Sequence, residues 1–153
     1  METTRAGEYL TFRVARQDFV LRSSRIRALL PVHELIPLDA PAGFVTGVIG
    51  ARGRDCPVLD LAAKLGIPAG SPGRQPCVIV AEAASPTGVS WFAFVADRIS
   101  DVVKLRERDF RGDSARVNGR TRRVLDPDAL LDRPASSPDP LESALHRDLL
   151  FRP

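Results

Sequence analysis

Short runs of β-prone residues, separated by turn signals, occupy most of the chain and restrict it to β-rich folds. Residues 9–14 alternate in polarity, residues 15–18 are typical of a turn, and residues 19–21 continue the apolar pattern. Such a pair of runs predicts a β-hairpin. A second hairpin is predicted at Asn118-Gly119, because both residues tolerate the positive φ angles of a two-residue turn. Short strands with few helices are typical of small β-barrels or of a β-sandwich.

The remaining runs predict further strands and a few short helices. The predicted strands are residues 34–38, 54–59, 77–81, 89–96 and 99–105. The predicted helices have a capping residue or a proline at their ends. They are residues 23–30, which end before Pro31, residues 61–65, between Asp60 and Gly66, and residues 127–131, which follow Asp126 and start at Pro127. Residues 110–117 are polar, and we expect them to be irregular.

A loop rich in proline, glycine and serine, residues 68–76, is the most plausible internal boundary. We therefore expect a first subdomain over about residues 8–67 and a second over about residues 76–132. Residues 133–153 begin with a proline- and serine-rich linker and continue with leucines at the spacing of a short amphipathic helix. We interpret them as a linker and tail outside the domain.

Composition and charge exclude several classes of protein. Hydrophobic residues make up 44% of the chain, which is enough for an apolar core. The net charge of +3 is low for a dedicated nucleic-acid-binding protein. The polar start, residues 1–7, predicts no secretory signal, and no apolar run is long enough to cross a membrane. We expect a cytoplasmic protein that is not inserted in a membrane.

Candidate catalytic and metal-binding residues are few and scattered. Cys56 and Cys77 lie in predicted strands without a metal-binding spacing, and we interpret them as small buried hydrophobic residues. His33 and His146 have no third ligand near them in sequence, and neither accompanies a nucleophile in an elbow motif. We therefore expect no metal, no cofactor and no enzymatic activity.

Glycines recur at positions 43, 47, 50 and 53, but this segment lacks the Lys-Ser/Thr pair that follows the last glycine of a phosphate-binding loop. The glycines are interpreted as turn and packing residues. Arg52 stands among them, on a turn between two predicted strands. An arginine fork pairs well with carboxylates or carbonyls across an interface, but an ordinary exposed turn arginine is about equally compatible with the chemistry.

Arginines are concentrated in residues 106–123, where Glu107, Asp109 and Asp113 interrupt them. Aromatic residues do not alternate with the arginines, so stacking on single-stranded bases is not indicated. We interpret this segment as a solvated rim that can meet an acidic partner. Nucleic-acid binding is the alternative, and its salt dependence would reveal it.

Several blocks of the sequence, in order, carry a resemblance to a known family. They are an opening hairpin over residues 9–21, a block over residues 26–65 with GFVTGVIGARG and CPVLDL, the run FAFVADRISDV over residues 92–102, and the closing VLDPDALL over residues 124–131. Together they resemble the CheW-like domain, an adaptor that links bacterial chemoreceptors to the histidine kinase CheA. The resemblance covers about residues 8–132. Its most specific part is the middle block, which the family writes F-I-x-G-V-x-N-L-R-G-x-x-x-P-V-I-D-L.

The resemblance implies a mainly β fold of two small SH3-like β-barrel subdomains that share a core, with short helices. It also implies a non-catalytic scaffold whose partners are a chemoreceptor cytoplasmic tip and the regulatory domain of a CheA-type kinase, without nucleic acid. The positions that match the family's receptor-binding motif are Arg52, Gly53, Gly47 and Ile26. The kinase-facing positions are Ala28, where many members carry a glutamate, and Leu29.

The sequence also departs from the family pattern. Gly50 and Ala51 replace an asparagine and a bulky apolar residue of the arginine motif. Residues 110–118 are shorter than the corresponding family segment, which predicts a second barrel that lacks a strand. Two alternatives remain open: a CheW-like adaptor in a parallel pathway for pili, development or gene regulation, and a small nucleic-acid-binding β-barrel.

Overall fold

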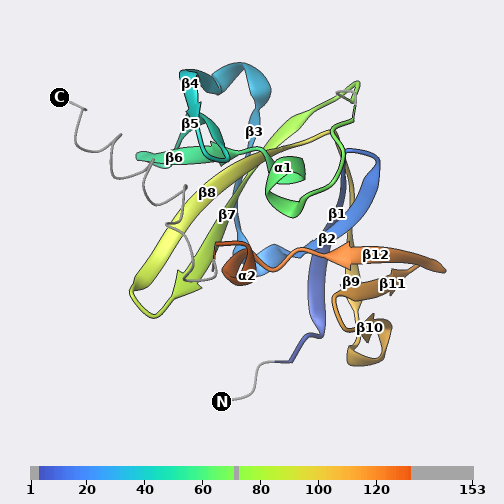
Figure 1. Ribbon diagram of the computed structural model, residues 1–153. Helices are drawn as coiled ribbons and strands as arrows, with labels where there is room; N and C mark the ends of the chain where they lie inside the picture. The colour runs from blue at the N-terminus through green and yellow to red at the C-terminus, as the bar shows by residue number, and fades with distance from the viewer. Residues whose placement is uncertain (1–3, 71–72, 132–153) are drawn as a thin grey trace.

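Twelve short strands dominate the part of the chain that the structure describes, which is residues 4–70 and 73–131 apart from the Pro41 side chain. The structure is a computed structural model (Figure 1). The strands are β1 Gly7–Val14, β2 Gln17–Arg22, β3 Ile26–Pro31, β4 Ile36–Ala42, β5 Val45–Ala51, β6 Arg54–Leu59, β7 Cys77–Ser85, β8 Gly88–Ala96, β9 Arg98–Leu105, β10 Phe110–Arg111, β11 Ser114–Val117 and β12 Arg120–Val124. The helices are the α-helices α1 Leu61–Leu65 and α2 Pro127–Leu131 and the 3-10 turns η1 Ser23–Arg25, η2 Val32–Glu34 and η3 Glu107–Asp109. The predicted linker and tail, residues 133–153, lie outside the described residues.

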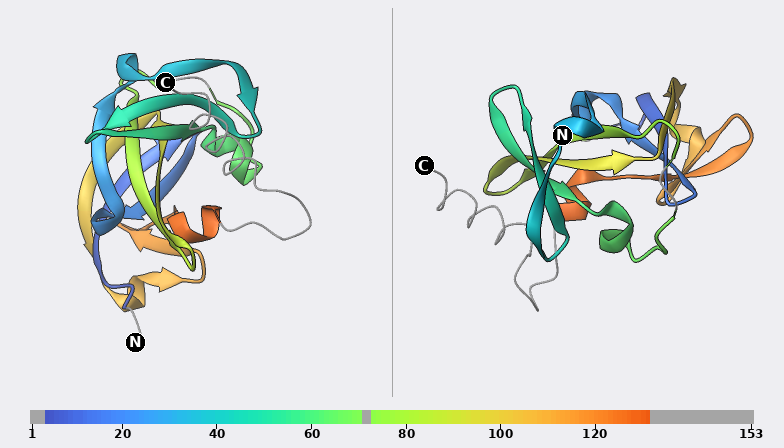
Figure 2. Two further views of the ribbon diagram at one scale, coloured as in Figure 1. Left: turned by 90° about the vertical axis from the view of Figure 1, so that its left-hand side faces the viewer. Right: turned by 90° about the horizontal axis from the view of Figure 1, so that it is seen from above.

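The strands form two curled six-stranded sheets, which we call barrel A and barrel B (Figure 2). Barrel A has the strand order β10-β11-β12-β2-β1-β9, and barrel B has the order β3-β7-β8-β6-β5-β4. The chain leaves barrel A after β2, builds barrel B from β3 to β8, and returns to barrel A with β9. Each barrel therefore contains strands from both predicted subdomains, 8–67 and 76–132, and the sheets do not coincide with that division.

Three apolar clusters explain why the central strands carry apolar side chains on both faces. In β7, Val78 and Val80 point into barrel B, whereas Ile79 and Ala81 point into a core shared by the two barrels. A smaller cluster that includes Tyr9 fills barrel A. The shared core, which we call the seam, holds the four phenylalanines Phe12, Phe19, Phe92 and Phe94, all at most 1% exposed. Two barrels that share an apolar seam confirm the expected fold class.

One polar side chain is buried in this framework, at an irregular point of the β1–β9 pairing. Thr11 is 2% exposed and lies where the register shifts between Leu10 and Phe12. Its hydroxyl donates to the Asp101 carbonyl at 3.1 Å and accepts from the Asp101 N–H at 2.9 Å. The hydroxyl thus satisfies backbone groups that the bulge leaves without a strand partner.

Local signals predicted several elements well. Asp60 accepts a hydrogen bond from Ala63 N at 3.1 Å and caps α1, which ends at Gly66 with a φ of 70°. The hairpin between β11 and β12 turns at Asn118 and Gly119, with φ angles of 51° and 79°. These two predictions are confirmed, as is the opening hairpin of β1 and β2.

Two predictions are wrong. Residues 23–30 are not one helix, because only the single turn η1 is helical and Ile26–Pro31 form strand β3 beside β7. Ile26 packs against the seam while Ala28 and Leu30 pack inside barrel B, so tertiary burial overrides the helical signal. Residues 110–117 are not irregular either. They form β10 and β11, whose buried Phe110, Ala115 and Val117 complete the interior of barrel A.

Candidate protein-interaction site

The β5–β6 hairpin places Arg52 at its tip. Ala51 pairs with Arg54, which leaves Arg52 and Gly53 as a two-residue turn with φ angles of 52° and 78°. Positive φ at both positions suits the right-handed twist of a hairpin, but it costs a non-glycine residue about 1 kcal/mol. Arg52 is exposed and forms no ion pair among the described residues. Its guanidinium is therefore available to a carboxylate from outside.

The two glycines of the predicted site have different roles. A Cβ on Gly47 would meet the Ile36 carbonyl oxygen and Leu35 Cδ2, each at 2.8 Å. Gly47 is buried and allows β4 to approach β5 closely, so it shapes the site without presenting a side-chain surface. A Cβ on Gly53 would meet nothing within 4 Å, so Gly53 is required by its backbone conformation.

The other predicted residues, Ile26, Ala28 and Leu29, lie on strand β3, and their side chains differ in exposure. Ile26 is half-buried against the seam, and Ala28 is half-buried against the interior of barrel B. Leu29 is 48% exposed. Of the two predicted kinase-facing residues, Leu29 thus offers a side chain to a partner, whereas Ala28 offers little.

A polar network joins the beginning of β3 to the beginning of β6, near the Arg52 turn. Arg27 donates to the two carboxylate oxygens of Glu82 from Nε at 3.1 Å and from Nη2 at 2.9 Å. Trp91 Nε1 donates to the same carboxylate at 3.2 Å, and the Arg54 guanidinium lies 4.2 Å from the Trp91 ring centroid. Because the network spans β3, β7, β8 and β6, Ile26 and Arg52 lie at the same end of barrel B.

Glu82 is the centre of this network. Hydrogen bonds from Arg27 and then from Trp91 favour the charged carboxylate and lower the pKa of Glu82 below its usual value. The hydrogen bond to Glu82 raises the pKa of Arg27, so both Arg27 and Glu82 are ionised at neutral pH. Sequence reasoning missed this network. The available signal was a two-residue hairpin turn at Pro86-Thr87. Such a turn sets the register of β7 and β8, and this register places Glu82 opposite Trp91.

A second ion pair fixes helix α2 on barrel B. Arg25 donates to both carboxylate oxygens of Asp128 at 2.8 and 2.7 Å, and the Ala84 N–H donates to Asp128 at 2.6 Å. Partial burial raises the pKa of Asp128, but the hydrogen bonds from Arg25 and Ala84 outweigh it, so the pKa lies below its usual value. Arg25 and Asp128 are 103 residues apart in the sequence.

The thiols and the possible metal ligands of the described residues are not arranged as a nucleophile or a metal site. Burial raises the pKa of the Cys56 and Cys77 thiols, which makes both poor nucleophiles at neutral pH. Residues 4–70 and 73–131 contain no group of three His, Cys, Asp or Glu side chains that could hold a metal ion. His33 is exposed in η2, and His146 lies outside the described residues. In the same ranges, no helix is both long and apolar enough to span a bilayer.

Comparisons with known proteins agree with this geometry. The family model of the CheW-like domain matches residues 8–135. A chemotaxis protein CheW of Rhizobium meliloti (strain 1021) is 28% identical over 109 residues, which cover 71% of this chain and 68% of that protein. A probable chemotaxis protein CheW of Rhizobium etli (strain ATCC 51251 / DSM 11541 / JCM 21823 / NBRC 15573 / CFN 42) is 25% identical over 65% of this chain and 62% of its own length.

A solved structure supports the fold independently. The crystal structure of the scaffolding protein TtCheW from Thermoanaerobacter tengcongensis superposes with a TM-score of 0.71 at 15% identity. The match covers 84% of this chain and 94% of TtCheW, so it includes both barrels. Since the family match extends over residues 8–135, the chain belongs to the CheW-like domain family.

Proposed function

We propose that the chain is a non-catalytic adaptor of chemotaxis-type signal transduction. It binds the cytoplasmic tip of a chemoreceptor and the regulatory domain of a CheA-type histidine kinase at the same time. The single observation that carries the receptor contact is the Arg52 turn, where an exposed arginine has no ion pair among the described residues and is held at positive φ. Family membership supports the pairing of receptor and kinase as partners.

The proposed mechanism is geometric. Arg52, Gly53 and Ile26 lie at one end of barrel B and form the receptor-binding surface, with Gly47 holding β4 and β5 together behind it. The kinase-facing surface is the exposed side of β3, where Leu29 supplies the apolar contact, whereas Ala28 beside it in the chain packs towards the interior of barrel B. A typical interface buries about 800 Å² per partner, which fits one end of a barrel of this size. Because both surfaces lie on barrel B, this barrel holds the two partners at a fixed separation.

The experiment is a pull-down with a receptor cytoplasmic fragment, comparing Arg52→Glu with Arg16→Glu. Arg16 is a matched control, because it is also an exposed arginine in a hairpin turn, with a φ of 70°, but it lies between β1 and β2. Both variants change the net charge equally. We expect Arg52→Glu to abolish receptor capture and Arg16→Glu to leave it intact. Capture of the receptor by Arg52→Glu at the wild-type level would remove Arg52 from the receptor site.

A further inference from the structure

Barrel A carries a concentration of positive charge that the receptor and kinase contacts do not use. Residues 106–123 contain seven arginines and three acidic residues, a net of four positive charges, whereas the whole chain has +3. The segment folds into η3, β10, β11 and β12. In Figures 1 and 2 it lies on the side of the molecule away from the β5–β6 hairpin. All of the net positive charge is thus gathered at one edge of the molecule.

Strand register places three of these arginines on one face. Arg111 pairs with Ser114, Ser114 pairs with Arg123, and Arg116 lies two residues after Ser114 on the same strand. Phe110, Ala115 and Val117 occupy the opposite face and are buried inside barrel A. With strands about 4.8 Å apart, Arg111 and Arg123 are separated by about 10 Å at the backbone, with Arg116 one step along β11. We call Arg111, Arg116 and Arg123 the basic face.

Three acidic residues near the basic face, Glu107, Asp109 and Asp18, already accept hydrogen bonds or ion pairs from other residues. Glu107 accepts hydrogen bonds from Thr4 and from the Arg5 N–H, and Asp109 accepts one from the Arg106 N–H. Asp18 pairs with Arg13 at 3.1 Å and with Arg122 at 3.8 Å.

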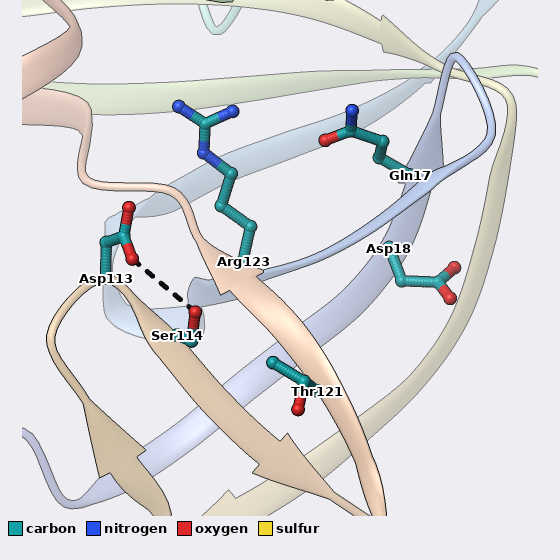
Figure 3. Close-up of a pocket in the computed structure, with 6 residues that line it drawn as sticks. All are labelled: Gln17, Asp18, Asp113, Ser114, Thr121 and Arg123. Atoms are coloured by element: carbon teal, nitrogen blue, oxygen red, sulfur yellow. Dashed lines mark hydrogen bonds between the residues drawn. The ribbon is translucent and has the colours of Figure 1, made fainter.

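The carboxylate of Asp113, by contrast, accepts only a long hydrogen bond, from the Ser114 hydroxyl at 3.5 Å (Figure 3). Among the described residues, Arg111, Arg116 and Arg123 form no ion pair.

A shallow polar hollow lies beside the basic face. Figure 3 shows its lining, which comes from β2, β11, β12 and the turn before β11: Gln17, Asp18, Asp113, Ser114, Thr121 and Arg123. Arg123 therefore lies at a recess that offers hydroxyl, amide and guanidinium donors beside the carboxylates of Asp18 and Asp113, so an acidic ligand is expected to bind the arginines outside this recess. An extended chain with carboxylates at every second residue can place acidic groups about 6.6 Å apart, and the same two-residue step along β11 separates Arg116 from the row of Arg111, Ser114 and Arg123.

We propose that the basic face binds an extended acidic segment of a partner protein, separately from the receptor and kinase contacts. Nucleic acid fits less well. Phe110 is buried, so no aromatic ring in residues 106–123 is available for stacking on bases. A membrane surface fits less well too, because the exposed large hydrophobic side chains of the described residues, Leu29, Ile36, Val89 and Val102, lie outside this segment.

The test measures fluorescence anisotropy of a labelled peptide of alternating glutamate and serine, titrated with the full chain at low and at high salt. The test variant is Arg111→Glu/Arg116→Glu/Arg123→Glu. Its control is Arg16→Glu/Arg74→Glu/Arg98→Glu, which reverses the same number of arginines, all exposed, in turns, loops and β9, whereas Arg123 of the basic face is half-buried. A third variant, with glutamine at the three basic-face positions, covers the case in which the glutamates disturb β12. Thermal unfolding confirms that each variant is folded.

We expect the wild-type chain to bind the acidic peptide, more weakly at high salt, and the basic-face variant to lose about tenfold or more in affinity. The control and Arg52→Glu stay within about twofold of the wild type. Equal losses in the basic-face variant and the control would overturn the proposal, because net charge alone would then explain binding. Absence of peptide binding, or tighter binding to duplex DNA or to phosphatidylserine vesicles than to the peptide, would overturn it as well.

Discussion

Barrels A and B differ in how they use their arginines, although Arg13 and Arg122 of barrel A also pair within the chain, with Asp18. In barrel B, Arg25, Arg27 and Arg54 are engaged by Asp128, Glu82 and Trp91. In barrel A, the basic face carries arginines that have no acidic partner among the described residues. Arginines that pair within the chain hold elements together, whereas unpaired ones are available for contacts with other molecules. The Arg52 turn is the exception in barrel B, and it is where we place the receptor.

The largest expected effect concerns the seam, which both barrels share. Phe94 is fully buried, and its ring centroid lies 5.5 Å from that of Phe12 and 6.2 Å from that of Phe92. Phe94→Ala should lower the free energy of unfolding by about 3–5 kcal/mol, because it leaves a cavity in the shared core. The measurement is urea denaturation, with Val89→Ala, in an exposed part of the same strand, as the control.

The same experiment tests whether the barrels unfold together. The chain contains one tryptophan, Trp91 in barrel B, and one tyrosine, Tyr9 in barrel A, so each barrel has its own spectroscopic probe. We expect the two probes to report the same midpoint, in the wild type and in Phe94→Ala. Separate midpoints would show that the seam does not couple the barrels and would contradict the rigid scaffold.

A smaller effect is expected at the ion pair that fixes α2. Asp128→Asn removes the charge that Arg25 grips with two hydrogen bonds, and it should cost about 1–2 kcal/mol, because the pair is partly exposed to solvent. Asp113→Asn in barrel A should change stability by less than about 0.5 kcal/mol, because Asp113 accepts only a 3.5 Å bond from Ser114. Equal losses in the two variants, measured by urea denaturation, would remove the difference between the barrels.

Acid should weaken the ion pairs of Glu82 and Asp128 and so lower the free energy of unfolding. The pKa values of Glu82 and Asp128 lie below their usual values in the folded state, so the unfolded chain binds more protons than the folded one. Their contribution is therefore complete above the unfolded-chain pKa and is lost as the pH falls from about 5 towards 3. The double variant Glu82→Gln/Asp128→Asn should lose less stability over this range than the wild type. An unchanged pH dependence would show that the two carboxylates are not responsible for it.

The smallest expected effect is at Arg54. Arg54→Ala removes a cation from above the Trp91 ring and should cost about 0.5–1 kcal/mol. The indole should become more exposed, which shifts its emission to longer wavelength. Arg98→Ala in β9, which has no ring contact among the described residues, serves as the control. An emission spectrum that Arg54→Ala leaves unchanged would mean that Arg54 does not cover the ring in solution.

The sequence predicted what local chemistry determines. The Asp60 cap, the Asn118-Gly119 turn and the strands whose two faces are both apolar needed only their own residues and immediate neighbours. Residues 26–31 were misassigned because Ser23 or Ser24 can cap a helix and Pro31 can end one, although the alternation of Ile26, Ala28 and Leu30 has the period of a strand. Only the pairing with β7 decides between the two.

The candidate site was predictable only in part. The Arg52 turn follows from glycine spacing and from the family resemblance, and the structure adds its exposure. The Arg25–Asp128 pair joins residues far apart in the sequence, and no local pattern connects them. The basic face likewise required the register of three strands, since a run of arginines does not show which side chains share a face.

The most direct test of the proposed adaptor is sedimentation velocity of the chain mixed with a receptor cytoplasmic fragment and a kinase regulatory domain. The wild type should form a three-component complex. Arg52→Glu should form only the complex of chain and kinase domain, because the Arg52 turn and the exposed side of β3 are separate contacts, and Arg16→Glu should behave as the wild type. A three-component complex that persists in Arg52→Glu, or that Arg16→Glu disrupts equally, would contradict the account.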